Sequence, residues 1–220
     1  MGLKVIITGT SGMVGEGILY ECLQNEKIES VLVVGRKPCG IEHEKLKEIL
    51  IRDFFNLFEI EDKIMEYDAC FFCLGTTSVG KSKEDYFRIT YELTLHFAKT
   101  LQKVNTQMTF CYVSGYGTDS TEKSKTNWAR VKGKTENELM TLSFKQVFNY
   151  RPAFIKPIKG LKHTHKYYKY LNWFYPIGNA LLPKLVTSLE ELGLAMINSV
   201  LYGYDKQVIE VQDIKKLSEL

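Results

Sequence analysis

Residues 3–15 read L-K-V-I-I-T-G-T-S-G-M-V-G, and this stretch decides the fold. Leu3–Thr8 is mostly apolar and β-branched, which predicts a strand, and apolar residues at helical spacing predict a helix over Met13–Gln24. Between them three glycines follow the pattern G-x-x-G-x-x-G. A glycine-rich turn between a first strand and a first helix is typical of a dinucleotide-binding βαβ unit.

Each of the three glycines has a predicted role. Gly9 would allow the tight turn, Gly12 would let a pyrophosphate approach the backbone, and Gly15 would let helix and strand pack closely. The positive end of the helix dipole would face the phosphates. Further donors would be the backbone N–H groups of Met13 and Val14 and the hydroxyls of Thr10 and Ser11. The alternative is a glycine-rich turn that binds no ligand.

Short β-rich runs alternate with helical patterns along the rest of the chain. The further predicted strands are Ser30–Val34, Ile51–Asp53, Ala69–Leu74, Met108–Ser114, Gln146–Tyr150 and Val208–Val211. The further predicted helices are Ile41–Leu50, Lys83–Lys103, Ser120–Leu142 and Ser188–Tyr202, the last with a capping box of Ser188 and Glu191. This alternation predicts an α/β fold, a doubly wound parallel Rossmann sheet with helices on both faces. We expect one domain over residues 1–220, with a small C-terminal lid.

The end of the second strand favours NADP(H) over NAD(H). NAD sites usually carry an acidic residue there, which holds the ribose 2′-hydroxyl, but this chain has Gly35-Arg36-Lys37. A guanidinium can hold a 2′-phosphate through two charge-assisted hydrogen bonds. The alternative is that Arg36 and Lys37 are solvated surface cations. Asp53, at the predicted end of the third strand, either meets the adenine amino group or is a plain turn acid.

Composition argues against several other classes of protein. The net charge of +3 is small and the basic residues are spread along the chain, so nucleic-acid binding is not expected. No run of roughly eighteen apolar residues predicts a transmembrane helix, and the N-terminus lacks signal-peptide regions. Five cysteines, an odd count, are typical of a reducing cytosol, so we expect a cytoplasmic protein. His163 and His165 have no acidic or cysteine partner near in sequence, so no metal site is predicted.

Several further motifs resemble the short-chain dehydrogenase/reductase superfamily, on its atypical side. They are V-G-R at 34–36, F-C-L-G-T-T at 72–77, V-S-G-Y-G at 113–117, V-K-G-K-T-E at 131–136 and Y-R-P at 150–152. With the glycine turn they most resemble the Tat-interacting-protein branch and its bacterial relatives, often labelled nucleoside-diphosphate-sugar epimerases. The resemblance covers nearly the whole chain and implies NADP(H) on a Rossmann sheet. It implies these contacts: Leu74, Gly75 and Thr76 beside the cofactor ribose, Ser114 beneath the nicotinamide, and Arg151–Phe154 over the nicotinamide edge.

The superfamily's catalytic Tyr-x-x-x-Lys pair, on one helix face, is here Trp128 and Lys132. The lysine would hold the ribose hydroxyls, whereas an indole N–H does not titrate usefully and cannot be the general acid. Trp128 would stack over the nicotinamide, line the substrate pocket or pack on the helix face. Tyr116 is either a substitute acid or a loop aromatic, and the superfamily's serine falls on Ser114 or on Gly115.

The least regular part of the sequence is Lys156–Val186, which is rich in lysine, tyrosine and proline. The resemblance implies a substrate lid there. Its cations and aromatics suit an anionic or aromatic ligand, a membrane surface or a protein partner, and an amphipathic cover over the core is the alternative.

One predicted function is an NADP(H)-dependent oxidoreductase or epimerase-like enzyme on a small carbonyl or hydroxyl compound, with Ser114, Tyr116 and Lys132 as catalytic residues. The other is a non-catalytic NADP(H) sensor that acts through a protein partner.

Overall fold

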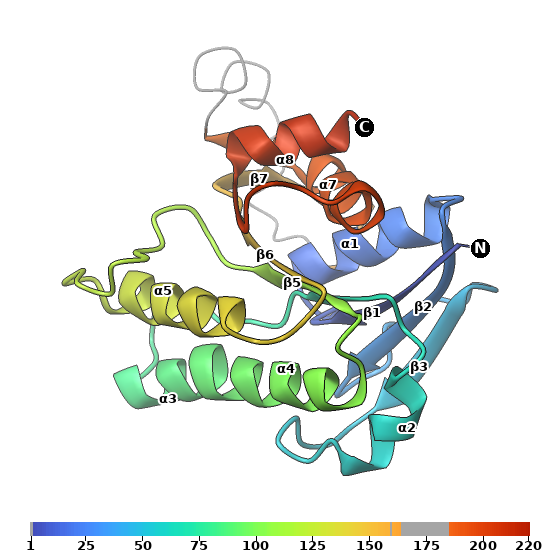
Figure 1. Cartoon of the computed structure of the whole chain (residues 1–220), viewed down its shortest axis with the longest axis horizontal. Coiled ribbons are helices and arrows are strands. Elements are labelled where there is room, and N and C mark those ends of the chain that lie inside the picture. The colour runs from blue at the N-terminus through green and yellow to red at the C-terminus, as the bar shows by residue number, and fades with distance from the viewer. Residues whose placement is uncertain (1, 159, 164–184) are drawn as a thin grey trace.

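Seven parallel strands form one sheet in the computed structural model, which describes residues 2–158, 160–163 and 185–220 (Figure 1). The strands are β1 (Leu3–Thr8), β2 (Ile28–Gly35), β3 (Leu46–Leu50), β4 (Ala69–Phe72), β5 (Thr109–Val113), β6 (Gln146–Arg151) and β9 (Val208–Glu210). Their order is β3-β2-β1-β4-β5-β6-β9, and every neighbouring pair is parallel. The order reverses between β1 and β4, and open α/β sheets bind ligands in the crevice beyond the strand ends at such a point.

Helices cover both faces of the sheet (Figure 1). One face carries α1 (Met13–Gln24), α7 (Leu189–Tyr202) and α8 (Val211–Ser218). The other carries η1 (Phe58–Ile60), α2 (Glu61–Ile64), α3 (Lys83–Phe87), the π-helical turn η2 (Arg88–Glu92), α4 (Leu93–Val104) and α5 (Asn127–Met140). Beside the main sheet, β7 (Phe154–Lys156) pairs with β8 (Val186–Ser188). The predicted α/β Rossmann architecture is confirmed.

The strands place alternate side chains into two separate cores. Val5 and Ile7 on β1 belong to the core cluster beneath α1 and α7. Ile6 between them belongs to the cluster beneath α4 and α5, which contains Phe97 and Leu139. Because the sheet is covered on both faces, its central strands are almost continuously apolar in sequence. No helix among the described residues is long and apolar enough to span a membrane.

The region after β2 differs from the prediction. The predicted helix Ile41–Leu50 and the predicted strand Ile51–Asp53 are both wrong, because the strand there is Leu46–Leu50. The apolar residues of this region have helical spacing, but parallel pairing with β2 along the whole of β3 overrides that local pattern. Asp53 therefore lies in the loop beyond β3 and does not end a strand.

The helix predicted over Ser120–Leu142 begins only at Asn127. Before it, the Asp119 carboxylate accepts hydrogen bonds from the Thr121 hydroxyl and from the backbone N–H groups of residues 121, 123 and 124. The Thr121 hydroxyl and then these N–H groups lower the pKa of Asp119. The loop crosses α5 at Gly133, where a Cβ would lie only 1.8 Å from the Asp119 carbonyl oxygen.

Two other predicted helices are present with one difference. The helix predicted over Lys83–Lys103 is formed by α3, η2 and α4 in sequence, so it contains a π-helical turn. The capping box of α7 is confirmed: Ser188 Oγ accepts from the N–H of Glu191 at 3.0 Å, and the Glu191 carboxylate accepts from the N–H of Ser188 at 2.6 Å. Most of the predicted lid Lys156–Val186, including His165, lies outside the described residues.

Candidate functional site

The glycine turn after β1 is built by close backbone contacts. Gly9 has a φ of +75°, and a Cβ there would lie 2.6 Å from the carbonyl carbon of Cys73, which directly follows β4. A Cβ on Gly15 would lie 2.3 Å from the Gly9 carbonyl oxygen. Only glycine satisfies these contacts, so the predicted reasons for Gly9 and Gly15, a tight turn and close packing of the helix on the strand end, are confirmed.

The backbone beyond this turn leaves room for a ligand. Among the described residues, a Cβ on Gly12 would meet only the Gly9 oxygen, at 3.5 Å, and a Cβ on Gly75 would meet nothing within 4 Å. Gly12 is the N-cap of α1 and forms no side-chain capping bond, so no cap side chain takes the first-turn N–H groups. Uncapped donors and open space at a helix N-terminus fit the pyrophosphate of a dinucleotide.

The other expected cofactor residues lie in the loops after β1 and β4 and in the first turn of α1. Leu74 follows β4 and donates its N–H to the Thr8 hydroxyl of β1 at 3.3 Å, so the loops after β1 and β4 are tied together. Ser11 and Gly75 are exposed, Thr10 is buried, and Met13, Val14, Leu74 and Thr76 are half-buried. Their roles at the cofactor stay predictions.

Arg36 and Lys37 directly follow β2, and both side chains are exposed. No carboxylate among the described residues lies within ion-pair distance of either cation. Asp53 is exposed as well, and its Oδ1 accepts the N–H of Phe55 at 2.9 Å, as a turn acid does. Its contact with adenine stays a prediction.

Lys132 and Ser114 meet at the carboxyl end of β5. Lys132 Nζ donates to the Ser114 carbonyl at 2.9 Å and lies 5.5 Å from the centre of the Tyr112 ring. Burial lowers the pKa of Lys132 to about 8, against the opposing effect of the Glu136 carboxylate. Ser114 is buried, and its hydroxyl lies 3.0 Å from that of Thr118. The structure thus brings together two of the three predicted catalytic residues.

Trp128 lies in the first turn of α5 and packs against the loop after β5. A Cβ on Gly117, whose φ is +84°, would lie 3.3 Å from an indole carbon of Trp128. Tyr116 precedes this glycine, and its side chain is exposed. The backbone N–H of Tyr116 donates to the Pro152 carbonyl at 2.9 Å, so this loop also contacts the loop after β6. The third predicted catalytic residue therefore lies at the same end of the sheet.

A buried ion pair joins two of the sequence motifs. Glu136, at the end of V-K-G-K-T-E, is fully buried, and Arg151 of Y-R-P donates its Nε to both carboxylate oxygens, at 3.0 and 3.2 Å. A terminal nitrogen of Arg151 contacts the same carboxylate. The other terminal nitrogen lies 3.2 Å from Glu210, which is half-exposed. Sequence reasoning missed this pairing, although a charged residue inside each motif was a signal for it.

A second missed residue is Glu16, in the first part of α1. It is buried, and its carboxylate accepts the backbone N–H groups of Lys162 and His163, both at 2.7 Å. The partners are about 146 residues apart in sequence, and no local pattern links them.

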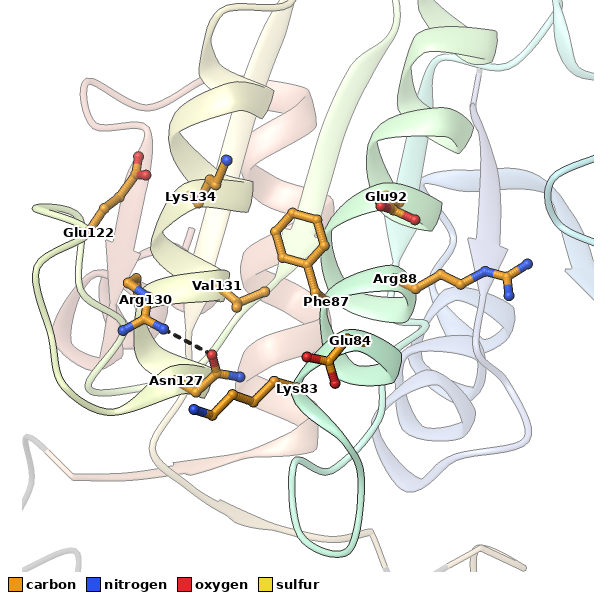
Figure 2. A pocket seen from close by; sticks show the side chains of 10 residues that line it. All are labelled: Lys83, Glu84, Phe87, Arg88, Glu92, Glu122, Asn127, Arg130, Val131 and Lys134. Atoms are coloured by element: carbon orange, nitrogen blue, oxygen red, sulfur yellow. Dashed lines mark hydrogen bonds between the residues drawn. The ribbon is translucent and has the colours of Figure 1, made fainter.

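A groove of about 670 Å³ lies on another part of the surface, between α3, η2 and α5 (Figure 2). Phe87 and Val131 face each other across its floor, and charged side chains of both signs surround them. Its lining includes none of the predicted cofactor or catalytic residues. The groove is therefore separate from the predicted dinucleotide site.

Two curated relatives match most of the chain. Protein HTATIP2 of Rattus norvegicus is 28% identical over 152 residues, which cover 68% of this chain and 62% of the rat protein. The match thus spans less than two thirds of the rat protein's length. The mitochondrial protein FMP52 of Meyerozyma guilliermondii is 25% identical over 162 residues, which cover 73% of this chain and 68% of that protein.

Solved structures share the fold. ADP-L-glycero-D-manno-heptose-6-epimerase of Helicobacter pylori has a TM-score of 0.68 at 14% identity, over 99% of this chain and 81% of that one. L-sorbose reductase of Gluconobacter frateurii, complexed with NADPH and L-sorbose, has a TM-score of 0.61 at 15% identity, over 94% of this chain and 93% of that one. The sequence model of the NAD dependent epimerase/dehydratase family matches residues 5–141. This chain therefore belongs to the NAD dependent epimerase/dehydratase family.

Proposed function

We propose that this protein binds NADP(H) and acts as an oxidoreductase on a small carbonyl or hydroxyl compound. The observation that carries the cofactor choice is the pair Arg36 and Lys37, two exposed cations at the end of β2, where NAD sites keep an acid. Similar folds have been solved with NADPH, as in L-sorbose reductase, and with NAD⁺, as in WbmF of Bordetella bronchiseptica. The residues after β2 are therefore the part of the chain that supports NADP(H) over NAD(H).

The bound cofactor would supply hydride chemistry at its nicotinamide, and the chain's own residues would supply the rest. Lys132, at the carboxyl end of β5, would hold the ribose hydroxyls. Ser114 would hold the substrate oxygen. Tyr116, exposed in the same loop, would exchange the proton that the missing phenol of the superfamily provides. Trp128 would line the substrate pocket.

A second candidate function is a non-catalytic NADP(H) sensor that acts through a protein partner. The observation in its favour is Trp128, which stands where the superfamily keeps its general acid and packs against Gly117. An indole cannot transfer the proton. In this alternative the cofactor residues keep their roles, and Tyr116 is a loop aromatic without a chemical role.

We also propose a reducing compartment, the cytosol, for this protein. All five cysteines are free, which supports such a compartment. The fungal relative named above is described as mitochondrial, so cell fractionation would test this part of the proposal.

Oxidation of NADPH in the presence of a panel of aldehydes and ketones separates the two functions. The oxidoreductase proposal predicts turnover by the wild-type protein and a loss of about 100-fold in kcat in Tyr116→Phe, the usual share of a general acid. Tyr20→Phe, which changes an exposed tyrosine on α1, should leave kcat unchanged. Tight NADPH binding without turnover on any compound would support the sensor instead.

The cofactor choice has its own test. Arg36→Ala should weaken NADP⁺ binding about tenfold while NAD⁺ binding changes less than about twofold, because only NADP⁺ carries the 2′-phosphate. Lys47→Ala, which removes an exposed cation from β3, controls for the change in net charge. Equal losses for the two nucleotides would refute the role of Arg36.

A further inference from the structure

Residues 160–163, called the strap here, cross the first turns of α1. Glu16 of α1 is only 5% exposed, and its two carboxylate oxygens accept the backbone N–H groups of Lys162 and His163. The ring nitrogen Nδ1 of His163 lies 3.0 Å from the same carboxylate. A buried carboxylate needs such partners, so this contact fixes the strap on the helix that carries the glycine turn.

The strap also reaches the loop that follows β2. Lys162 Nζ donates to the Gly40 carbonyl at 3.0 Å, and a Cβ on Gly40 would lie 3.3 Å from that nitrogen. Cys39 and Ile41, on either side of Gly40, pack into the core cluster beneath α1. The ammonium of Lys162 therefore sits against a fixed part of the loop.

This is the loop that begins with Arg36 and Lys37. All three cations are exposed, and none has a carboxylate within ion-pair distance in the part of the chain that the structure describes. An ammonium has three donors, and the Gly40 carbonyl takes one of them. Two of these cations thus begin the loop, and the third is hydrogen-bonded to Gly40 of the same loop. Cations on one loop and on the segment bonded to it suit an anion with more than one charge.

We propose that the strap is the outer wall of the adenosine half of the cofactor site, and that Lys162 is a third cation for the 2′-phosphate of NADP(H). Glu16 acts as the positioning residue, because it holds the strap in place. This inference rests on the proposed function and deepens it. Lys162 lies 122 residues from Gly40 in sequence, so the pattern at the end of β2 does not contain it.

Titration with the adenosine half of the cofactor tests the proposal without nicotinamide chemistry. Two probes, 2′,5′-ADP and 5′-AMP, differ only in the 2′-phosphate, and calorimetry gives the Kd of each. In Lys162→Ala we expect the Kd of 2′,5′-ADP to rise about tenfold, because one charge-assisted hydrogen bond at an exposed site is lost. The Kd of 5′-AMP should rise less than about twofold. Lys162→Arg keeps the charge and should stay within about threefold of the wild type.

The chain offers a matched control. Lys45 Nζ also donates to one backbone carbonyl, that of Asn25 at 2.9 Å, at the other end of α1, so Lys45→Ala should change neither Kd. Glu16→Ala releases the strap and should raise the Kd of 2′,5′-ADP by the same factor as Lys162→Ala. The double variant should show no further loss, because both changes remove one shared contact.

The wild type and the variants answer different questions. Tighter binding of 2′,5′-ADP than of 5′-AMP by the wild type supports the proposed cofactor whatever the variants do. Equal losses for the two probes in Lys162→Ala, or no loss for either, would overturn the role of Lys162 alone. A wild-type protein that binds neither probe would overturn the proposed function and this inference together.

Discussion

Replacing Glu136 by glutamine should destabilise the protein strongly, because it removes the negative charge that pairs with the buried Arg151 guanidinium. Glu136→Gln keeps the size of the side chain, and the carboxylate is fully buried while the Arg151 side chain is only 10% exposed. Breaking a buried ion pair from one side costs about 3–5 kcal/mol, since the remaining charge is left without its partner. Glu210 still lies 3.2 Å from Arg151, so we expect the lower end, about 3 kcal/mol.

Thermal and urea unfolding would measure this loss. For a chain of this size about 3 kcal/mol corresponds to a fall in Tm of roughly 6–12 °C. Glu210→Gln is the control, because it removes the other carboxylate that contacts Arg151, and the Glu210 side chain is 45% exposed. A pair with one half-exposed partner contributes about 1 kcal/mol, and glutamine keeps an oxygen for the contact by which Glu210 caps α8, so this variant should lose less than about 4 °C. Equal losses in the two variants would refute the argument that burial makes the Glu136 contact the important one.

Three further predictions concern the site. Trp128→Tyr should create or raise carbonyl-reductase activity on generic aldehydes with NADPH, and equal inertness of variant and parent on a broad panel would contradict the view that only the general acid is missing. Gly15→Ala should lower Tm by several degrees, because its Cβ would lie 2.3 Å from the Gly9 oxygen, whereas Gly12→Ala should keep Tm within about 2 °C and still weaken NADP⁺ binding. Burial lowers the pKa of Lys132 from the usual 10.5, which applies in the unfolded chain, to about 8 in the folded protein. Between these two pH values the unfolded chain binds more protons than the folded protein, so the contribution of Lys132 to stability rises with pH. In urea unfolding, the free energy of unfolding of the wild type minus that of Lys132→Met should rise by roughly 2–3 kcal/mol from pH 7.5 to 10. A difference that stays constant over this range would contradict the lowered pKa.

The parts of the fold that were predicted from sequence are those fixed by local patterns. The β1 run, the glycine turn and α1 form one contiguous unit whose turn geometry depends on residues within the stretch itself. The strand β3 was not predicted, because its pairing with the open edge of β2 decides its conformation. The start of α5 moved to Asn127 because the Asp119 carboxylate takes the backbone N–H groups that a helix would otherwise use.

The candidate site divides in the same way. The glycines and the cations after β2 were found from short motifs, and in the structure they follow β1 and β2, two neighbouring parallel strands. Contacts made across the chain were not found: Arg151 with Glu136, and Glu16 with the strap. Glu136 and Arg151 are 15 residues apart in sequence, and Glu16 and Lys162 are 146 residues apart. Both contacts bury charged groups only when separate segments of the chain meet, so no local spacing pattern pairs them.

Calorimetric titration of the purified wild-type protein with NADP⁺ and then with NAD⁺, after removal of any carried-over nucleotide, tests the central claim most directly. The account predicts that NADP⁺ binds with a Kd at least about tenfold lower than that of NAD⁺, because the 2′-phosphate meets the cations beyond β2. Binding of NAD⁺ as tight as that of NADP⁺, or no binding of either, would contradict it.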